Sequence, residues 1–271
     1  MAAYYQRIPV AHVEAGLRTH DIYSPWPEEI NRTLTGGIAE YHFAPTEVSK
    51  MNLLRENITK NVEVVGNSVI DSLLWTANKI NTNQKLNNQL TVHFTKLGLD
   101  FSKRIILITG HRRENFGSGF VNICQAIKEI ALSYPDIDLV YPVHLNPNVQ
   151  QPVNEFLSDV TNVKLIEPQN YQHFVFLMQQ SYLILTDSGG VQEEAPSLKK
   201  PVLVMRDTTE RPEAVDAGGV ILVGTNKKLI VDSVNRFLND REYYLKKINV
   251  QNPYGAGNTS KQILKYLKQY L

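Results

Sequence analysis

The sequence predicts an α/β protein built on a parallel sheet with helices on both faces. Short apolar runs rich in β-branched residues alternate along the chain with segments of helical period. Buried strands separated by helices in this way are typical of parallel sheets with right-handed crossovers. Polar residues and glycines follow these strands directly, and ligands of open α/β sheets bind at the carboxyl ends of strands. The pattern therefore predicts both a doubly wound fold and the edge of the sheet where its site lies.

The first sixty residues predict only part of a sheet. RIPVAHVE at 7–14 and YHFAPT at 41–46 are typical of strands, and helical patterns cover 28–39 and 49–57. Two strands are too few for an independent sheet with two covered faces. The chain also opens on MAAYYQR, which resembles the end of a helix. We expect a first lobe that lacks its N-terminal strands, on the order of a hundred residues given the usual size of domains.

The rest of the chain predicts a complete doubly wound unit from about 62 to 240, for which six strands suffice. The predicted strands are 62–66, 104–112, 138–144, 162–168, 182–190, 201–207 and 219–224. The predicted helices are 68–82, 117–133, 147–158, 171–180, 190–198, 210–217 and 226–239. After the turn-rich NPYGAGN, an amphipathic helix at 260–271 can pack back on the first lobe. We therefore divide the chain into a first-lobe remnant at 1–65, a second lobe at 66–252 and a C-terminal segment at 253–271.

Composition excludes several classes of protein. The net charge of +1 gives no sign of a polyanion-binding surface. No run approaches the ~20 apolar residues of a membrane span, and the start has no signal-peptide architecture. The single cysteine, Cys124, lies in an amphipathic helical pattern, which favours a buried thiol over a nucleophile. The seven histidines form no HExxH pair and join no cysteine cluster, so we expect no metal site.

The segment TDSGGVQEE at 186–194 combines a strand end, a Ser-Gly-Gly turn and a helix start. Backbone N–H groups at a helix start bind phosphate, and glycines let it approach closely. Ser188, Gly189 and Gly190 are therefore candidates for holding phosphate, and Glu194 for accepting hydrogen bonds from a ribose diol. The alternative is a glycine turn followed by acids that the helix dipole favours.

The segment TGHRRENF at 109–116 places His111, Arg112 and Arg113 directly after a strand. Three potential cations at the mouth of a site favour an anionic ligand. The alternative is a solvated basic loop.

The segment VMRDTTERPEA at 204–214 carries Arg206 and Arg211 after another strand. An arginine here can reach the same phosphate site. Ion pairing at the surface explains the same residues equally well.

The segment at 12–32 is rich in carboxylates. Glu14 ends an otherwise apolar strand, and Glu28 and Glu29 precede a helix. Paired carboxylates serve as general base and general acid where their surroundings separate their pKa values. The helix dipole explains Glu28 and Glu29 without catalysis, whereas Glu14 is harder to explain in this way because it sits at an otherwise apolar strand end.

These segments together resemble one family. HVEAGLRT, YSPWPEEINR, GHRREN, YPVHLNP, DSGGVQEEAPSLKKPVLVMRDTTERPE and NPYGAGN, in this order, are similar to the bacterial non-hydrolysing UDP-N-acetylglucosamine (UDP-GlcNAc) 2-epimerases. The resemblance covers essentially the whole chain. It implies the glycosyltransferase B type of fold, with two Rossmann-like lobes of which the first is incomplete here. It also implies conversion of UDP-GlcNAc to UDP-N-acetylmannosamine (UDP-ManNAc) by elimination and re-addition of UDP, without a nicotinamide or other cofactor.

The resemblance also implies roles for individual residues. Ser188, Gly189 and Gly190 would hold phosphate, and Glu194 the ribose. Arg211 and His111 would contact the diphosphate, and Gln169 and Phe174 would line the uracil pocket. Glu14 and Glu28 are the acid–base candidates, with His111 counted as catalytic. Arg112 and His144 would make further substrate contacts, some of them tied to activation by a second substrate molecule.

Two segments of the family pattern are missing from this sequence: a GTRPE-like loop that supplies an arginine, and an HGDT-like segment that supplies a catalytic aspartate. Both would precede Met1. We therefore expect the 271-residue chain to fold poorly alone and to turn over little substrate.

Three other functions fit parts of the pattern. They are a sugar transferase of the same fold, a hydrolysing epimerase and a non-catalytic binder of UDP-sugars. By resemblance we expect a cytoplasmic homodimer that supplies surface polysaccharide synthesis and binds neither nucleic acid nor membrane.

Overall fold

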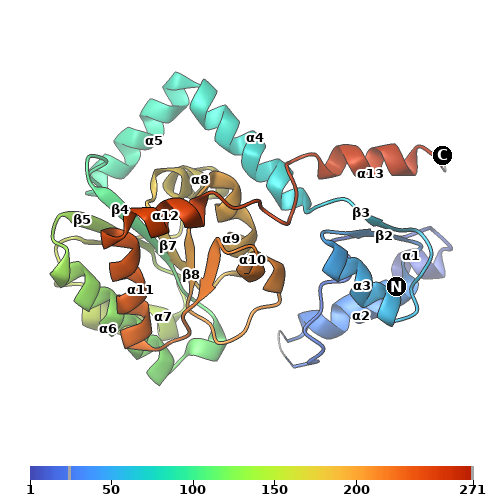
Figure 1. The fold of residues 1–271 in the computed structure, drawn as a ribbon, viewed down its shortest axis with the longest axis horizontal. Coiled ribbons are helices and arrows are strands. Elements are labelled where there is room, and N and C mark those ends of the chain that lie inside the picture. Colours follow the sequence, from blue (N-terminus) through green and yellow to red (C-terminus); the bar gives the residue numbers. More distant parts are fainter. Residues whose placement is uncertain (24–25, 270–271) are drawn as a thin grey trace. The chain divides into compact units, whose positions relative to one another are not determined.

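A computed structural model describes residues 1–23 and 26–269 of the chain. The chain separates into two compact units. Unit 1 comprises Met1–Trp75, Thr209–Glu213 and the segment from Asn252, and unit 2 comprises Thr76–Thr208 and Ala214–Gln251. Each unit carries its own parallel sheet (Figure 1).

Unit 1 is built on a three-stranded parallel sheet in the order β1-β2-β3. Its strands are β1 (Ala11–Val13), β2 (Tyr41–Ala44) and β3 (Val62–Val64). Its first helices are α1 (Ala2–Tyr5), α2 (Glu28–Ile38) and α3 (Glu47–Arg55). The sequence predicted two strands here and placed the apolar run at 62–66 in the doubly wound unit. That placement was wrong, because β3 pairs with β2, and a short apolar run does not show which neighbour it pairs with.

The C-terminal segment is bound to unit 1 at the start of its helix. The carboxylate of Asp71, on α4 (Ser68–Thr82), accepts hydrogen bonds from the backbone N–H groups of Thr259 (2.9 Å) and Ser260 (2.8 Å). It thereby caps α13 (Thr259–Leu267). Tyr266 on α13 packs edge-on against Phe43 of β2. The helix predicted to run to residue 271 ends at Leu267, and residues 270 and 271 lie outside the described residues.

Unit 2 is built on a six-stranded parallel sheet in the order β6-β5-β4-β7-β8-β9. The strands are β4 (Arg104–Thr109), β5 (Ile137–Pro142), β6 (Val163–Ile166), β7 (Leu183–Thr186), β8 (Val202–Val204) and β9 (Val220–Leu222). The chain starts at the centre with β4, runs outward to β6, returns to β7 beside β4 and runs outward again to β9. This is the doubly wound order of Rossmann folds, with its switch point between β4 and β7.

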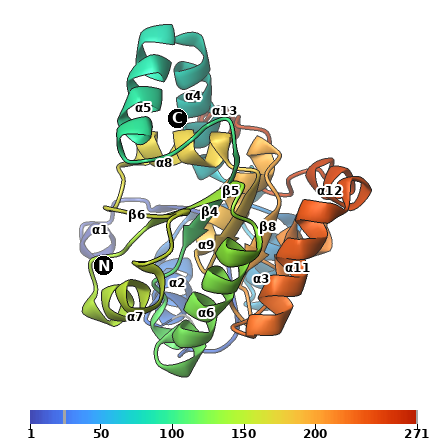
Figure 2. The same cartoon turned by 90° about the vertical axis from the view of Figure 1, so that its left-hand side faces the viewer.

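One face of this sheet is covered by α6 (Ser118–Ser133), α7 (Pro147–Leu157) and α11 (Lys227–Asn239). In Figure 2 α6 and α11 lie side by side in front of the strands. Alternate strand residues such as Ile106 and Ile108 pack against them, as the two-residue period of a strand requires. Helix α8 (Tyr171–Gln180) contacts β4, and its Phe176 stacks on Phe94 of α5 (Gln84–Lys96).

The remaining helices of this part of the chain are short. They are η1 (Arg113–Asn115), α9 (Gly189–Glu194), η2 (Ala195–Leu198), α10 (Pro212–Asp216) and α12 (Arg241–Ile248). The sequence prediction missed α5 and α12. Helix α5 buries only Leu90 and Phe94 and α12 buries no residue fully, so neither presents a broad apolar stripe.

Within residues 1–23 and 26–269, no helix is both long and apolar enough to cross a lipid bilayer. The same residues contain no group of three or more histidine, cysteine or acidic side chains placed to hold a metal ion.

Candidate functional site

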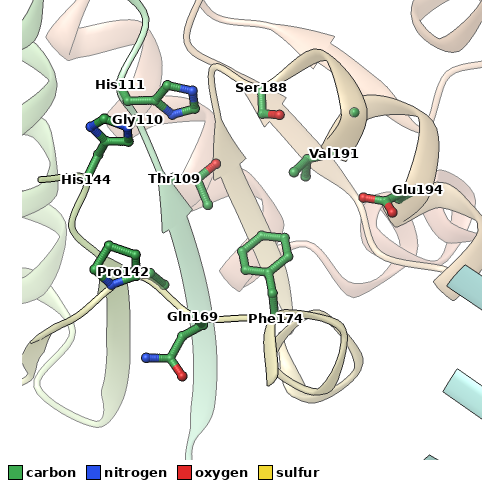
Figure 3. Close-up of a pocket in the computed structure, with 12 residues that line it drawn as sticks. Thr109, Gly110, His111, Pro142, His144, Gln169, Phe174, Ser188, Val191 and Glu194 are labelled. Atoms are coloured by element: carbon green, nitrogen blue, oxygen red, sulfur yellow. The ribbon is translucent and has the colours of Figure 1, made fainter. Parts of the chain in front are cut away.

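A pocket of about 280 Å³ lies in unit 2 at the switch point of the six-stranded sheet. Strands β4 and β7 are neighbours, and their following loops diverge to opposite halves of the unit, which opens a crevice above the sheet. The lining residues follow the carboxyl ends of four adjacent strands and are drawn in Figure 3: Thr109, Gly110, His111, Pro142, His144, Pro168, Gln169, Phe174, Ser188, Gly190, Val191 and Glu194. The sequence predicted a site at this edge.

Asp187 holds the loop after β4 in place through hydrogen bonds to its backbone. It is fully buried and directly follows β7. Its Oδ2 accepts hydrogen bonds from the backbone N–H groups of His111 and Arg112, each at 2.8 Å, and from the amide of Asn115 at 3.4 Å. The backbone N–H groups of His111 and Arg112 therefore point toward the Asp187 carboxylate. The side chain of His111 lines the pocket.

His111 and His144 form a stacked pair, with ring centroids 5.1 Å apart and planes within 15°. Figure 3 shows the two rings next to each other at one side of the pocket. Burial lowers the pKa of His111, the Asp187 carboxylate opposes this, and His144 and Arg112 add to the lowering. In the ligand-free protein His111 is therefore predominantly neutral at neutral pH.

The Ser-Gly-Gly turn leads from β7 into α9. Ser188 is the residue before the first turn and its side chain makes no capping hydrogen bond to the helix, so its hydroxyl is available to the pocket that it lines. A Cβ atom on Gly190 would have only the Ser188 Oγ, 4.0 Å away, within contact distance. Gly190 therefore leaves open space in the pocket wall, and Gly189 is buried at the start of the helix. The turn presents backbone to any ligand in the pocket.

Glu194 lines the side of the pocket that faces away from the histidine pair (Figure 3). The carboxylate is buried, with 6% of the residue exposed, and its Oε1 accepts a hydrogen bond from the hydroxyl of Tyr171 at 2.8 Å. Burial raises the pKa of Glu194, and the Tyr171 hydrogen bond partly offsets the rise. One hydroxyl donor satisfies only part of a carboxylate's capacity, so this group has oxygen lone pairs left for a ligand.

Gln169 and Phe174 form another part of the pocket wall. Gln169 precedes α8 and donates its side-chain amide to the carbonyl of Glu167 at 2.7 Å. Phe174 lies in the first turn of α8 and is half-buried. An aromatic face beside an amide is suited to a flat, hydrogen-bonding ring.

The arginines lie in different places. Arg112 follows His111 but is not among the described residues that line the pocket, and its Nε is buried without a hydrogen-bond partner among them. Arg206 in unit 2 pairs with Glu114 at 2.5 Å. Arg211 belongs to unit 1, where its guanidinium contacts Glu210 at 2.5 Å. The structure thus brings the predicted pocket residues together within unit 2, with Arg112 next to His111 in the chain, whereas Arg211 belongs to unit 1.

The predicted acid–base residues both belong to unit 1. Glu14 directly follows β1 and is half-buried, with φ = +64°, a left-handed conformation that is uncommon for residues other than glycine and clusters at functional sites. Two residues later, Gly16 also has a positive φ, and a Cβ there would lie 2.0 Å from the carbonyl oxygen of Ser49. The turn after β1 therefore requires glycine at position 16, because any larger residue would collide with the backbone of α3.

Glu28 and Glu29 differ sharply in their surroundings. Glu28 is exposed, whereas Glu29 is 3% exposed and its Oε1 accepts hydrogen bonds from the backbone N–H groups of Thr19 (3.1 Å) and His20 (2.9 Å). Glu29 therefore holds the loop after β1, and Glu28 remains free of the described hydrogen bonds.

Comparisons with known proteins connect this geometry to a function. A family model described as UDP-N-acetylglucosamine 2-epimerase matches residues 1–268. The chain is 58% identical over 269 residues to the UDP-N-acetylglucosamine 2-epimerase of Escherichia coli (strain K12), covering 99% of this chain and 71% of the relative. This chain belongs to the UDP-N-acetylglucosamine 2-epimerase family.

Solved structures of the family support the fold. The Neisseria meningitidis enzyme bound to UDP-GlcNAc matches with a TM-score of 0.94 and 53% identity, covering 99% of this chain and 72% of that one. The Methanocaldococcus jannaschii enzyme in complex with UDP-GlcNAc and UDP matches with a TM-score of 0.81 and 40% identity, over 98% of this chain and 71% of that one. The predictions of this family and of a glycosyltransferase B type of α/β fold are confirmed.

Two residues of the site were missed from the sequence. Asp187 lies inside the quoted TDSGG segment, but its role depends on a contact with the loop 76 positions earlier. Tyr171 is separated by 23 residues from Glu194. A carboxylate buried at the end of a strand and flanked by a polar turn was the available signal for Asp187; the pairing with Tyr171 left no local signal.

Proposed function

We propose that this protein is a UDP-GlcNAc 2-epimerase, which interconverts UDP-GlcNAc and UDP-ManNAc without net hydrolysis. The observation that carries the proposal is the pocket at the switch point of unit 2. It combines a backbone-presenting Ser-Gly-Gly turn, a stacked histidine pair and a buried carboxylate in a chain of the epimerase family. Each feature suits a different part of a nucleoside diphosphate sugar.

The diphosphate is assigned to Ser188, Gly189 and Gly190. N–H groups at a helix start and an open glycine position favour phosphate oxygens. His111 contacts the same group from the opposite loop. We propose that Arg211, Arg112 and His144 supply further contacts to substrate, His144 through its stack on His111.

The nucleoside is assigned to the parts of the pocket formed by Phe174 and Gln169 and by Glu194. The uracil ring lies against Phe174, with Gln169 offering hydrogen bonds to its edge. Glu194 accepts hydrogen bonds from the ribose hydroxyls with the lone pairs that Tyr171 leaves free.

The chemistry explains why such a site needs cationic and N–H groups around the diphosphate. The C2 proton of the sugar is not acidic, so departure of UDP must begin by developing positive charge at C1. Donors that stabilise the departing diphosphate therefore lower the barrier. As the C1–O bond breaks, its electron pair leaves with UDP. A carboxylate takes the C2 proton, and the C2–H electrons form the C1=C2 bond of 2-acetamidoglucal.

The return step inverts C2. A proton is delivered to the opposite face of C2, and the diphosphate oxygen re-adds at C1. We propose Glu14 and Glu28 as the acid–base pair, because one is held in an uncommon backbone conformation after β1 and the other is exposed at the start of α2. The first half-reaction removes one proton and UDP, and the second adds one proton, delivered to the other face, and the same UDP, so the two halves balance without a cofactor.

We further propose the setting in which the reaction occurs. The protein acts in the cytoplasm as a homodimer and supplies an N-acetylmannosamine donor to surface polysaccharide synthesis. UDP-GlcNAc and UDP-ManNAc are its ligands, and neither nucleic acid nor membrane takes part.

The proposal is tested by incubating the purified chain with UDP-GlcNAc and following the sugar signals by NMR. The expected result is slow formation of UDP-ManNAc, in line with the low turnover expected of this chain, and no accumulation of free UDP. Stoichiometric release of UDP with N-acetylmannosamine would indicate a hydrolysing enzyme. Tight binding without turnover would indicate a non-catalytic binder, and transfer that depends on an added acceptor would indicate a sugar transferase.

A further inference from the structure

The two oxygens of the Asp187 carboxylate are used unequally. Oδ2 accepts all three hydrogen bonds, from His111 N, Arg112 N and Asn115 Nδ2. Oδ1 is buried and has no hydrogen-bond partner in the described part of the chain. A buried, unpaired carboxylate oxygen is costly, and such exceptions call for an explanation.

The ring of His111 is a candidate partner for this oxygen. Its Nδ1 lies 3.8 Å from Oδ1 of Asp187, about 1 Å too far for a hydrogen bond. The His111 side chain is 42% exposed, whereas Asp187 is completely buried. The imidazole is therefore the partner that can move, and the carboxylate is the fixed reference.

The surroundings limit how His111 can move. His144 from the end of β5 stacks on one side of the ring, and the backbone N–H of His111 is tied to Asp187. The charged and titratable groups that act on the ring are Asp187, His144 and Arg112. Of these, only Asp187 favours a positive charge on it.

We propose that Asp187 is a positioning residue for His111. When a diphosphate occupies the pocket, Oδ1 accepts a hydrogen bond from Nδ1–H of a protonated His111. Its Nε2–H then donates to the ligand, so the imidazolium bridges two anions. The role of the ligand rests on the proposed function, whereas the contact between the two side chains does not.

The bridge has a consequence for protons. The ligand-free ring is predominantly neutral at neutral pH, so binding of the diphosphate draws one proton from solvent. The only new covalent bond is the N–H bond between the ring and this proton, and Asp187 stays ionised throughout. A carboxylate beside an imidazole acts in this way by fixing the tautomer and stabilising the imidazolium.

The variant Asp187→Asn separates positioning from support of the loop. The asparagine oxygen can still accept from the His111 and Arg112 N–H groups, so its NH₂ group faces Nδ1 and makes that nitrogen an acceptor. Asp159→Asn is the matched control, because Asp159 is an exposed carboxylate of unit 2 that pairs with Lys128 at 3.0 Å.

The first measurement is ¹⁵N NMR of the imidazole nitrogens of the full chain without ligand. Asp187→Asn is expected to lower the pKa of His111 further, because it removes the carboxylate that favours a positive charge on the ring. Asp159→Asn is expected to leave this pKa unchanged. An unchanged His111 pKa in Asp187→Asn would overturn the proposal.

The second measurement is the affinity for UDP-GlcNAc, which has no phosphate that titrates near neutral pH, as a function of pH. The defect of Asp187→Asn is expected to be smallest where His111 is protonated in both proteins and to grow with pH, by about ten-fold for each unit by which the His111 pKa falls. An equal defect at every pH would show that Asp187 only supports the loop.

If Asp187→Asn fails to fold, the proposal is tested on the wild-type chain by calorimetry of UDP-GlcNAc binding in buffers of different ionisation enthalpy. Uptake of about one proton per UDP-GlcNAc is expected at a pH above the free His111 pKa, and its loss is expected in His111→Gln. No uptake in the wild type would contradict the proposal. Binding and proton uptake without epimerisation would instead count against the proposed function and leave the positioning role standing.

Discussion

The hydroxyl of Tyr171 donates a hydrogen bond to Oε1 of Glu194 at 2.8 Å. This contact joins the first residue of α8 to the last residue of α9, whose Glu194 lines the pocket of unit 2. It holds a buried carboxylate whose pKa is raised by desolvation. The site therefore keeps an acid where an uncharged residue would be more stable, as expected when the acid has a ligand to bind.

Replacing Glu194 by Gln tests this trade-off. The folded-state pKa of Glu194 lies above its unfolded value, so its contribution to stability is fully present at low pH and is lost as pH rises through the folded pKa. At neutral pH the ionised group destabilises the fold. Glu194→Gln is expected to raise the melting temperature by about 2–4 °C, corresponding to about 1 kcal/mol, while weakening UDP binding. The two effects are read by calorimetry. A variant that melts earlier and binds UDP normally would contradict the assignment.

Replacing Gly190 by Ala tests the open pocket wall. The added methyl group meets only the Ser188 Oγ at 4.0 Å, so folding is undisturbed and helix propensity favours alanine by up to about 1 kcal/mol. UDP affinity is expected to fall by at least about ten-fold, because a lost contact of about 1.4 kcal/mol has that effect. Gly37→Ala is the matched control, since a Cβ there has no neighbour within 4 Å. Gly37 also lies in a helix, but in unit 1. Equal UDP affinities in the two variants would contradict the assignment of the phosphate to the Ser-Gly-Gly turn.

The neighbours Glu28 and Glu29 are expected to respond in opposite ways to replacement by alanine. Glu28→Ala removes an exposed group, so the melting temperature stays unchanged, while turnover falls by about 10²–10⁴-fold if Glu28 is an acid–base residue. Glu29→Ala leaves the N–H groups of Thr19 and His20 without their acceptor and destabilises the chain by about 1–3 kcal/mol. Thermal melts and an epimerisation assay of both variants measure this. Normal turnover in Glu28→Ala would exclude its catalytic role.

Unit 1 is expected to lose stability in mild acid. Burial, aided by His42, Arg18 and Arg32, lowers the pKa of His12 from 6.5 to about 4. A group with a depressed folded pKa of this kind stabilises the fold as the neutral form above pH 6.5, and the stabilisation is lost as pH falls toward 4. His42, its register partner on β2, has a lowered pKa as well. Urea unfolding at several pH values should show this loss, and His12→Gln should make it shallower. A flat profile in the wild type would contradict the burial of neutral histidines.

The fold could be predicted where a local pattern decides it. The helix predicted at 68–82 is α4, Ser68–Thr82, because its apolar period is clear and Asn67 accepts from the Val69 N–H at its start. Predicted strands were too long at their polar ends. The strand predicted at 182–190 stops at Thr186, because Asp187 turns back to the loop after β4.

The parts that could not be predicted depend on contacts distant in sequence. Nothing local distinguishes exposed Glu28 from buried Glu29, since the loop that Glu29 caps comes from residues nine and ten positions earlier. The pairing of Asp187 with the His111 loop and of Tyr171 with Glu194 exists only once β4 and β7 are neighbours. The sequence predicted that the segments at 109–116 and 186–194 contribute to the pocket, and the structure added how its acids and histidines are held.

The central step of the proposed reaction is the loss and replacement of the proton at C2, and it is most directly measured by running the reaction of UDP-GlcNAc in D₂O. We predict that UDP-ManNAc forms with deuterium at C2 and that recovered UDP-GlcNAc also acquires it there, with the diphosphate sugar intact. Formation of UDP-ManNAc that retains the original C2 proton, or of N-acetylmannosamine with stoichiometric free UDP, would contradict the account.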